Sequence, residues 1–223
     1  MSTIGICSFT PALATTIEVA RAADEAGLDS TWTGEFNDRS AIVALAEMAH
    51  HTSNCRIGSA IAYAVGRSPL ILANEARGLD EISGGRLVLG IGTGTKGMQK
   101  GWHGERDPDS PASRLEELVP LLRRIWRLHE GPVRHEGRFY SMNLTATAEV
   151  LPPTRERIPV FTAAVNARMI ETAGRVLARR EVVAGQTQDR GRRSSREPRE
   201  VGLSLLAERA DPLASLVALE EQF

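Results

Sequence analysis

The chain has 223 residues, a length that allows one domain with a sizeable core. Its 42% hydrophobic and 25% charged content is ordinary for a globular protein, and its net charge of −1 gives no overall attraction to nucleic acid. Two cysteines exclude a disulfide scaffold and favour the cytoplasm. We find neither a signal peptide nor a run near the roughly 20 apolar residues of a membrane span, so we expect no membrane partner.

Short apolar runs alternate with helical periodicity in the N-terminal half. The predicted strands are 4–9, 29–33, 56–62 and 87–92, and the first of them is expected to be buried. The predicted helices are 15–26, 42–49 and 69–82. Gly27 ends the first helix, and Pro69 begins the third. Four strand–helix repeats in this order predict parallel βαβ units with right-handed crossovers, which fit both a (β/α) barrel and a doubly wound sheet.

The segment from Leu79 to Gly94 is the most informative part of the chain. A helix ending in Leu-Asp-Glu-Ile-Ser meets two glycines, which supply the positive φ of a helix C-terminus. The apolar run 87–91 follows, and its continuity predicts a strand buried on both faces of a parallel sheet. Glycines at 90, 92 and 94 then allow a ligand to approach the backbone closely.

This segment resembles the hallmark of the luciferase-like monooxygenase family, a Leu-Asp-x-x-Ser-Gly-Gly-Arg helix end followed by a Leu-Gly-x-Gly-x-Gly strand end. The resemblance covers residues 3 to about 176 and looks closest to the branch that uses the deazaflavin coenzyme F-420 rather than FMN. It implies a flavin- or deazaflavin-dependent oxidoreductase that acts on a small organic substrate by hydride transfer or monooxygenation. It also favours the barrel, so we expect an α/β fold: an incomplete TIM (β/α) barrel of about five parallel strand–helix units.

The middle of the chain interrupts the alternation. Residues 93–112 are polar and rich in glycine, and we expect an irregular insertion there. Ser113 and Glu116 form a capping-box pattern for a helix through about His129, which Pro120 is expected to kink or fray. The remaining predicted elements are a hairpin at 136–140, a strand at 159–165 and a helix from 167 to 176.

The alternation stops after residue 177. We therefore divide the chain into a partial barrel domain, 1–177, and an atypical tail, 178–223. Seven arginines and no aromatic residue fall between 178 and 200, as a truncation or frameshift relative to the family would produce. We expect disorder there, or short helices at 201–206 and 213–219. Since five strands leave sheet edges exposed, the competing hypothesis is a non-catalytic remnant or scaffold, or a homodimer that buries an edge.

Gly92, Thr93 and Gly94 are candidate cofactor-binding residues because they end the fourth predicted strand. With Gly97 they match Gly-x-Gly-x-x-Gly, the pattern of a Rossmann dinucleotide site. A Rossmann site also needs a helix that starts at once. Because the residues that follow carry no helical apolar stripe, we favour a loop at the C-terminal face of a barrel, where barrel active sites lie, over a Rossmann site. A plain loop is the remaining alternative.

Two further candidate segments follow from the resemblance. Ala60 and Ile61 correspond to residues that pass under the cofactor ring, often through a non-prolyl cis peptide, and a simple buried strand is the alternative. Ala164, Val165 and Asn166 correspond to residues that bind the cofactor phosphate, where a helix N-terminus favours an anion. The alternative role of Asn166 is that of a helix N-cap alone.

His103 and Glu35 are the candidate catalytic residues. Trp102 and His103 lie in the insertion, where they would cover substrate or donate a proton unless they are simply solvated. Many deazaflavin relatives carry an Asp-His pair after the second strand, whereas this chain has Glu35 and Phe36. Because Phe36 cannot transfer a proton, Glu35 is left as a polar contact or a solvated loop residue. No metal-ligand spacing occurs, and we expect no metal.

Overall fold

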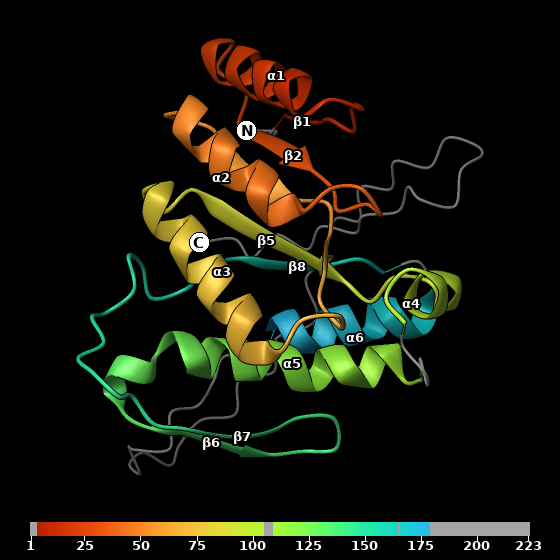
Figure 1. Ribbon diagram of the computed structural model, residues 1–223, viewed down its shortest axis with the longest axis vertical. Helices are drawn as coiled ribbons and strands as arrows, with labels where there is room; N and C mark the ends of the chain where they lie inside the picture. Colours follow the sequence, from red (N-terminus) through yellow and green to blue (C-terminus); the bar gives the residue numbers. More distant parts are fainter. Residues whose placement is uncertain (1–3, 105–108, 165, 179–223) are drawn as a thin grey trace, which may run out of the picture.

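The computed structural model describes residues 4–104, 109–164 and 166–178 (Figure 1). Its strands are β1 Gly5–Cys7, β2 Ser30–Thr33, β3 Arg56–Ser59, β4 Ala62–Tyr63, β5 Leu87–Gly92, β6 Val133–Glu136, β7 Ser141–Leu144 and β8 Val160–Thr162. Its helices are α1 Leu13–Glu25, α2 Ala41–His51, α3 Pro69–Ile82, α4 Lys96–Gly101, α5 Pro111–Trp126, the 3-10 helix η1 Leu128–Glu130 and α6 Ala167–Ala178. Our expectations for Val165 and for the tail after Ala178 fall outside the described residues.

One parallel sheet forms the centre of the molecule. Its order is β1-β2-β3-β5, with β4 and β8 also paired to β5, and every pairing in it is parallel, as predicted. β3 and β4 both pair with β5 and are joined by a short crossing, residues 60–61. Among the residues described, β1 pairs only with β2 and β8 pairs only with β5, so the sheet is an incomplete (β/α) barrel. The predicted hairpin is also present, since β6 and β7 pair antiparallel.

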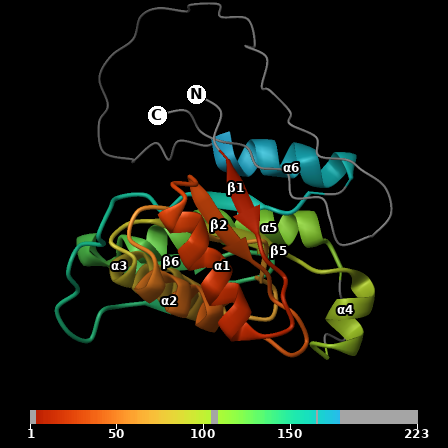
Figure 2. The same ribbon diagram turned by 90° about the horizontal axis from the view of Figure 1, so that it is seen from above.

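The helices cover one face of this sheet in chain order. α1 packs on α2, α2 on α3, α3 on α5 and α5 on α6, as Figures 1 and 2 show from two directions. α5 presents an apolar stripe, which includes Leu115, Leu118 and Leu122, to the core. All six residues of β5 are buried, which confirms the prediction of a strand covered on both faces. Among the helices described, none combines the length and the apolar character that crossing a membrane requires.

The Leu-Asp-x-x-Ser-Gly-Gly-Arg motif has a structural role in this fold. Gly84 and Gly85 end α3 with φ of +64° and +82°, as predicted. The guanidinium of Arg86 donates hydrogen bonds to backbone carbonyls at the C-terminal end of α2, those of Ala49, Thr52 and Cys55. The carboxylate of Asp80, only 2% exposed, accepts hydrogen bonds from Arg155 Nε (3.0 Å) and Nη2 (2.6 Å). The motif thus joins α2, α3 and the segment that leads to β8.

The prediction of a buried first strand is wrong. All three residues of β1 are exposed, and Ile4 and Ile6 beside and within it are 62% and 39% exposed. The apolar run forms the strand as expected, but β1 is an edge strand with β2 as its one neighbour in the described part of the sheet. Burial depends on that tertiary position, which the local sequence does not encode.

The insertion 93–112 is less irregular than predicted, because it contains the six-residue helix α4. The Oγ1 of Thr95 accepts a hydrogen bond from the N–H of Met98 at 3.2 Å, so Thr95 is its N-cap. Gln99 is the one residue of α4 that is buried. A helix with so little buried surface carries no apolar stripe, and periodicity therefore missed it.

The capping box predicted at Ser113 is also wrong. α5 begins two residues earlier, at Pro111, a favoured residue in the first helical turn. Glu116 instead accepts hydrogen bonds from side chains of α6. The helix runs through Pro120 to Trp126 without interruption. Buried side chains on both sides of Pro120 hold the helix in the core, and this packing prevents the expected fray.

Candidate functional site

The carboxyl ends of the strands bring several predicted cofactor-binding residues together. A Cβ added at Gly92 would lie 2.8 Å from Ile61 Cδ1 and 3.3 Å from the Cβ of Ala163. Ala164, the next residue along, is 1% exposed. The ends of β5 and β8 and the segment between β3 and β4 therefore meet in one apolar layer.

The peptide bond between Ala60 and Ile61 is cis, at the position that the resemblance implied. Beside it, the hydroxyl of Ser59 bridges both backbone polar groups of Gly90. Ser59 Oγ accepts from the Gly90 N–H at 2.9 Å and donates to the Gly90 carbonyl at 2.7 Å. A Cβ at Gly90 would lie 1.8 Å from the Ser59 carbonyl oxygen. Glycine at 90 thus serves the approach of two strands rather than the approach of a ligand.

The loop after β5 turns over the ring of Tyr63. Gly94 has a φ of +67°, and a Cβ there would lie 3.1 Å from the Tyr63 ring. Thr93 is 7% exposed, and its carbonyl accepts a hydrogen bond from Gln99 Nε2 at 2.7 Å. The helix that follows has six residues, whereas the Rossmann pattern needs a full crossover helix at this place.

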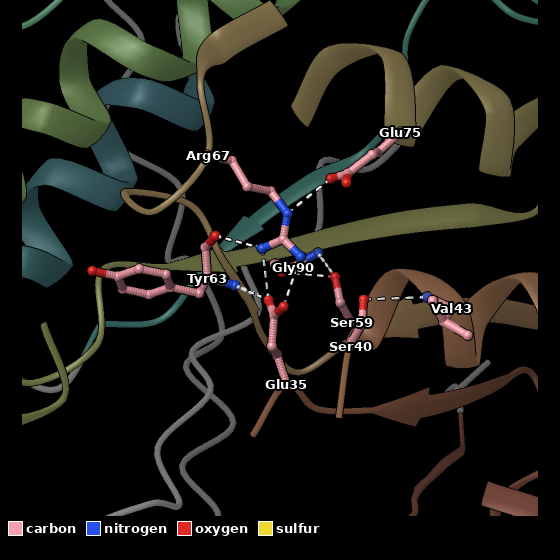
Figure 3. A network of polar contacts seen from close by, with 8 residues as sticks. All are labelled: Glu35, Ser40, Val43, Ser59, Tyr63, Arg67, Glu75 and Gly90. Carbon is pink, nitrogen blue, oxygen red and sulfur yellow. Dashed lines mark hydrogen bonds and ion pairs between the residues drawn. The ribbon is translucent and has the colours of Figure 1, made fainter. Parts of the chain in front are cut away.

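Glu35 lies in a network of polar contacts after β2 (Figure 3). Its carboxylate accepts hydrogen bonds from Arg67 Nη2 at 2.6 Å, Arg67 Nη1 at 2.8 Å and the Tyr63 N–H at 2.6 Å. Arg67 Nε also forms an ion pair with Glu75 of α3 at 2.8 Å. Burial opposes the charge on Arg67, but the hydrogen bonds and charges of Glu35 and Glu75 outweigh it and raise the pKa of Arg67.

His103 packs against the same tyrosine. The rings of Tyr63 and His103 stack with centroids 3.6 Å apart and planes 12° apart. The neighbouring Trp102 is 48% exposed. On the other side of Glu35, Phe36 meets Phe9 edge to face, with ring centroids 5.6 Å apart. The Phe9–Phe36 pair and the Tyr63–His103 pair thus both involve residues that follow strand ends or lie in them.

Asn166 lies at the start of α6. Its Oδ1 accepts a hydrogen bond from the N–H of Met169 at 3.0 Å, which is the geometry of an N-cap. Capping leaves the positive end of the helix dipole directed towards this edge of the sheet.

Sequence reasoning gave no role to Arg67 or Glu75, and it placed Tyr63 and Phe9 only at the ends of predicted strands, without their contacts. Arg67 belongs to a segment without helical or strand periodicity, and Glu75 reads as an ordinary polar residue of α3. No local signal marks them, since their roles come from contacts across the fold. In the described ranges, no three His, Cys, Asp or Glu side chains gather in a way that would hold a metal ion.

An incomplete parallel barrel whose strand ends bring Ile61, Gly92 and Ala163 together agrees with the fold that the resemblance implies. The profile of the family described as luciferase-like monooxygenase matches residues 3–192, and the chain belongs to that family. The match runs beyond residue 176, where we expected the resemblance to end.

The chain is similar to enzymes of both cofactor types. It is 30% identical to a proposed coenzyme F-420-dependent oxidoreductase of Mycobacterium tuberculosis, over 71% of this chain and 48% of that protein. It is 31% identical to the oxygenase component of flavin-dependent trigonelline monooxygenase of Acinetobacter baylyi, over 66% and 42%.

Among solved structures, the coenzyme F-420-dependent tetrahydromethanopterin reductase of Methanopyrus kandleri matches with a TM-score of 0.62 and 26% identity, over 77% of this chain and 53% of that one. The chain therefore spans about half the length of the curated relatives it matches.

Proposed function

We propose that this protein is a flavin- or deazaflavin-dependent oxidoreductase of the luciferase-like type. It binds coenzyme F-420 or FMN at the carboxyl ends of the strands and acts on a small organic substrate. The observation that carries the proposal is the apolar layer at the carboxyl ends of the strands, where Ile61, Gly92 and Ala163 meet. Such a layer fits the flat ring of a deazaflavin or flavin. We assign this function to the partial barrel domain, 1–177.

The start of α6 fits the phosphate of either cofactor. The helix has twelve residues, and its first turn carries the exposed Arg168. A helix N-terminus with a nearby cation favours an anion. We propose that Ala164 and Asn166 contact the cofactor phosphate, as the resemblance implies for this segment. Thr93 and Gly94 would line the opposite side of the site.

A bound deazaflavin supplies hydride transfer, and a bound reduced FMN supplies oxygen activation. The chain's own residues bind the ring, orient it and exclude water. Phe9 and Phe36 provide an apolar wall beside the strand ends. His103 is exposed at the rim, and it is our candidate for holding a proton near the substrate.

The exposed edge of the sheet favours a second candidate function, that of a non-catalytic scaffold or of a homodimer. Ile4 and Ile6, beside and within β1, are 62% and 39% exposed. Apolar side chains on an unpaired strand edge promote association. A chain that associates without taking up a cofactor would fit this second candidate.

Titration of the purified chain with FMN and with coenzyme F-420, followed by absorbance and fluorescence, distinguishes the oxidoreductase from the scaffold. We expect saturable binding of one of the two cofactors. Riboflavin, which has the FMN ring without the phosphate, is the matched control and should bind more weakly than FMN if the start of α6 holds the phosphate. No spectral change with either cofactor, together with a stable dimer in sedimentation, would support the scaffold instead.

A further inference from the structure

Glu35 holds one short segment of the site at two points. Its backbone N–H donates to the carbonyl of Ile61 at 3.0 Å. Its carboxylate accepts the N–H of Tyr63 at 2.6 Å. These two hydrogen bonds fall on either side of Ala62, directly after the cis peptide. Glu35 therefore fixes the path of the chain where it leaves that bond.

Arg67 completes the grip on Tyr63. Its Nη1 donates to the carbonyl of Tyr63 at 2.7 Å, while Glu35 accepts the N–H of the same residue. Through Nε, Arg67 also forms an ion pair with Glu75 of α3. We call Glu35, Arg67 and Glu75 together the clamp. Figure 3 shows the guanidinium between the two carboxylates. The ring of Tyr63 in turn stacks on His103, so the clamp also sets the position of His103.

A carboxylate in this arrangement is poorly suited to proton transfer. Both of its oxygens accept hydrogen bonds from N–H groups, and the guanidinium binds it in a forked geometry. Phe36, the neighbour of Glu35, has no titratable group. Positioning, rather than acid–base chemistry, is therefore what Glu35 can supply.

We propose that Glu35 is a positioning residue. With Arg67 and Glu75 it forms a clamp that holds the crossing from Ala60 to Tyr63 in the shape that receives the cofactor ring. The part of the proposal that concerns the ring rests on the proposed function, whereas the clamp itself is a property of the chain. The two are therefore tested by separate measurements.

Glu35→Gln is the test variant, because glutamine keeps the shape but replaces one acceptor with a donor facing Arg67. Glu117→Gln is the matched control. Glu117 is likewise 13% exposed, and it accepts hydrogen bonds from the N–H groups of Phe139 and Tyr140 in the hairpin. Both variants remove one charged acceptor of backbone N–H groups, at two different places.

The hydrogen exchange rate of the Tyr63 amide, measured in the full chain, tests whether Glu35 holds Tyr63. In Glu35→Gln the Tyr63 amide should exchange about tenfold to a hundredfold faster, as the loss of a charge-assisted hydrogen bond implies. In Glu117→Gln the Tyr140 amide should accelerate while the Tyr63 amide is unchanged. An unchanged Tyr63 amide in Glu35→Gln overturns the proposal. If that variant does not fold, Arg67→Lys, which keeps the charge but loses the fork, should give a smaller acceleration at Tyr63.

A titration with FMN and with coenzyme F-420 tests the part of the proposal that concerns the ring. Glu35→Gln should weaken uptake of the cofactor and change the absorption band of the bound ring, whereas Glu117→Gln should do neither. Uptake and an absorption band equal to those of the unaltered chain in Glu35→Gln would overturn that part. If the unaltered chain takes up neither cofactor, the proposed function fails, and the Tyr63 exchange rate still decides the clamp.

Discussion

Replacing Ser59 by alanine should destabilise the protein strongly, although it removes a single oxygen. Ser59 is fully buried, and its hydroxyl satisfies both the N–H and the carbonyl of Gly90, at 2.9 Å and 2.7 Å. Each buried backbone group left without a partner costs about 1–3 kcal/mol. Allowing for some relaxation, we expect Ser59→Ala to lower the free energy of unfolding by about 2–4 kcal/mol, a large share of the roughly 5–15 kcal/mol of a typical domain.

Urea unfolding of the full chain, followed by circular dichroism, measures this loss. Ser40→Ala is the matched control, because Ser40 Oγ accepts one longer hydrogen bond of 3.4 Å from Val43 at the exposed start of α2 (Figure 3). That helix cap should be worth about 1 kcal/mol or less. If Ser59→Ala costs no more than Ser40→Ala, the Ser59 hydroxyl does not bridge the two strands, and our explanation of Gly90 is wrong.

Three further predictions concern other parts of the fold. Burial opposes ionisation of Asp24, but backbone N–H groups of residues 53–55 outweigh it and lower its pKa from 3.8 to about 2. The unaltered chain should therefore have a higher free energy of unfolding than Asp24→Asn above pH 3.8, and this difference should vanish towards pH 2. Urea unfolding that gives the same difference above pH 3.8 and near pH 2 would contradict this. Gly94→Val should weaken cofactor binding in a fluorescence titration by crowding Tyr63 at a positive φ, while Gly97→Ala in α4 should not. Arg155→Ala should cost about 3–5 kcal/mol in thermal unfolding because it leaves the carboxylate of Asp80 buried without its partner, and a loss below about 1 kcal/mol would refute that role.

Local sequence was sufficient for the elements that are both apolar and central. β5 was predicted with its observed bounds, 87–92, because a continuous apolar run in a parallel sheet is buried wherever it lies. Gly84 and Gly85 were predicted to have positive φ because they follow the end of a helix, and both do. The cis bond at Ala60 followed from the family resemblance rather than from any pattern of the residues.

The contacts across the fold could not be predicted in this way. The bonds of Glu35 to Tyr63 and Arg67 join residues separated by 28 and 32 positions in the sequence. No periodicity specifies such a pairing, since it arises from the convergence of two strand ends. The exposure of β1 has the same origin, because it depends on the neighbours of that strand and not on its composition.

The central claim is that the cofactor binds at the carboxyl ends of the strands, and amide chemical shifts in NMR spectra test it most directly. FMN and coenzyme F-420 would each be titrated into the isotopically labelled full chain. Our account predicts that the amides of Ile61, Gly92 and Gly94 shift most, while those of Gly85 and Leu87 at the opposite ends of the strands do not move. Shifts concentrated at Gly85 and Leu87, or no shifts at saturating cofactor, would contradict it.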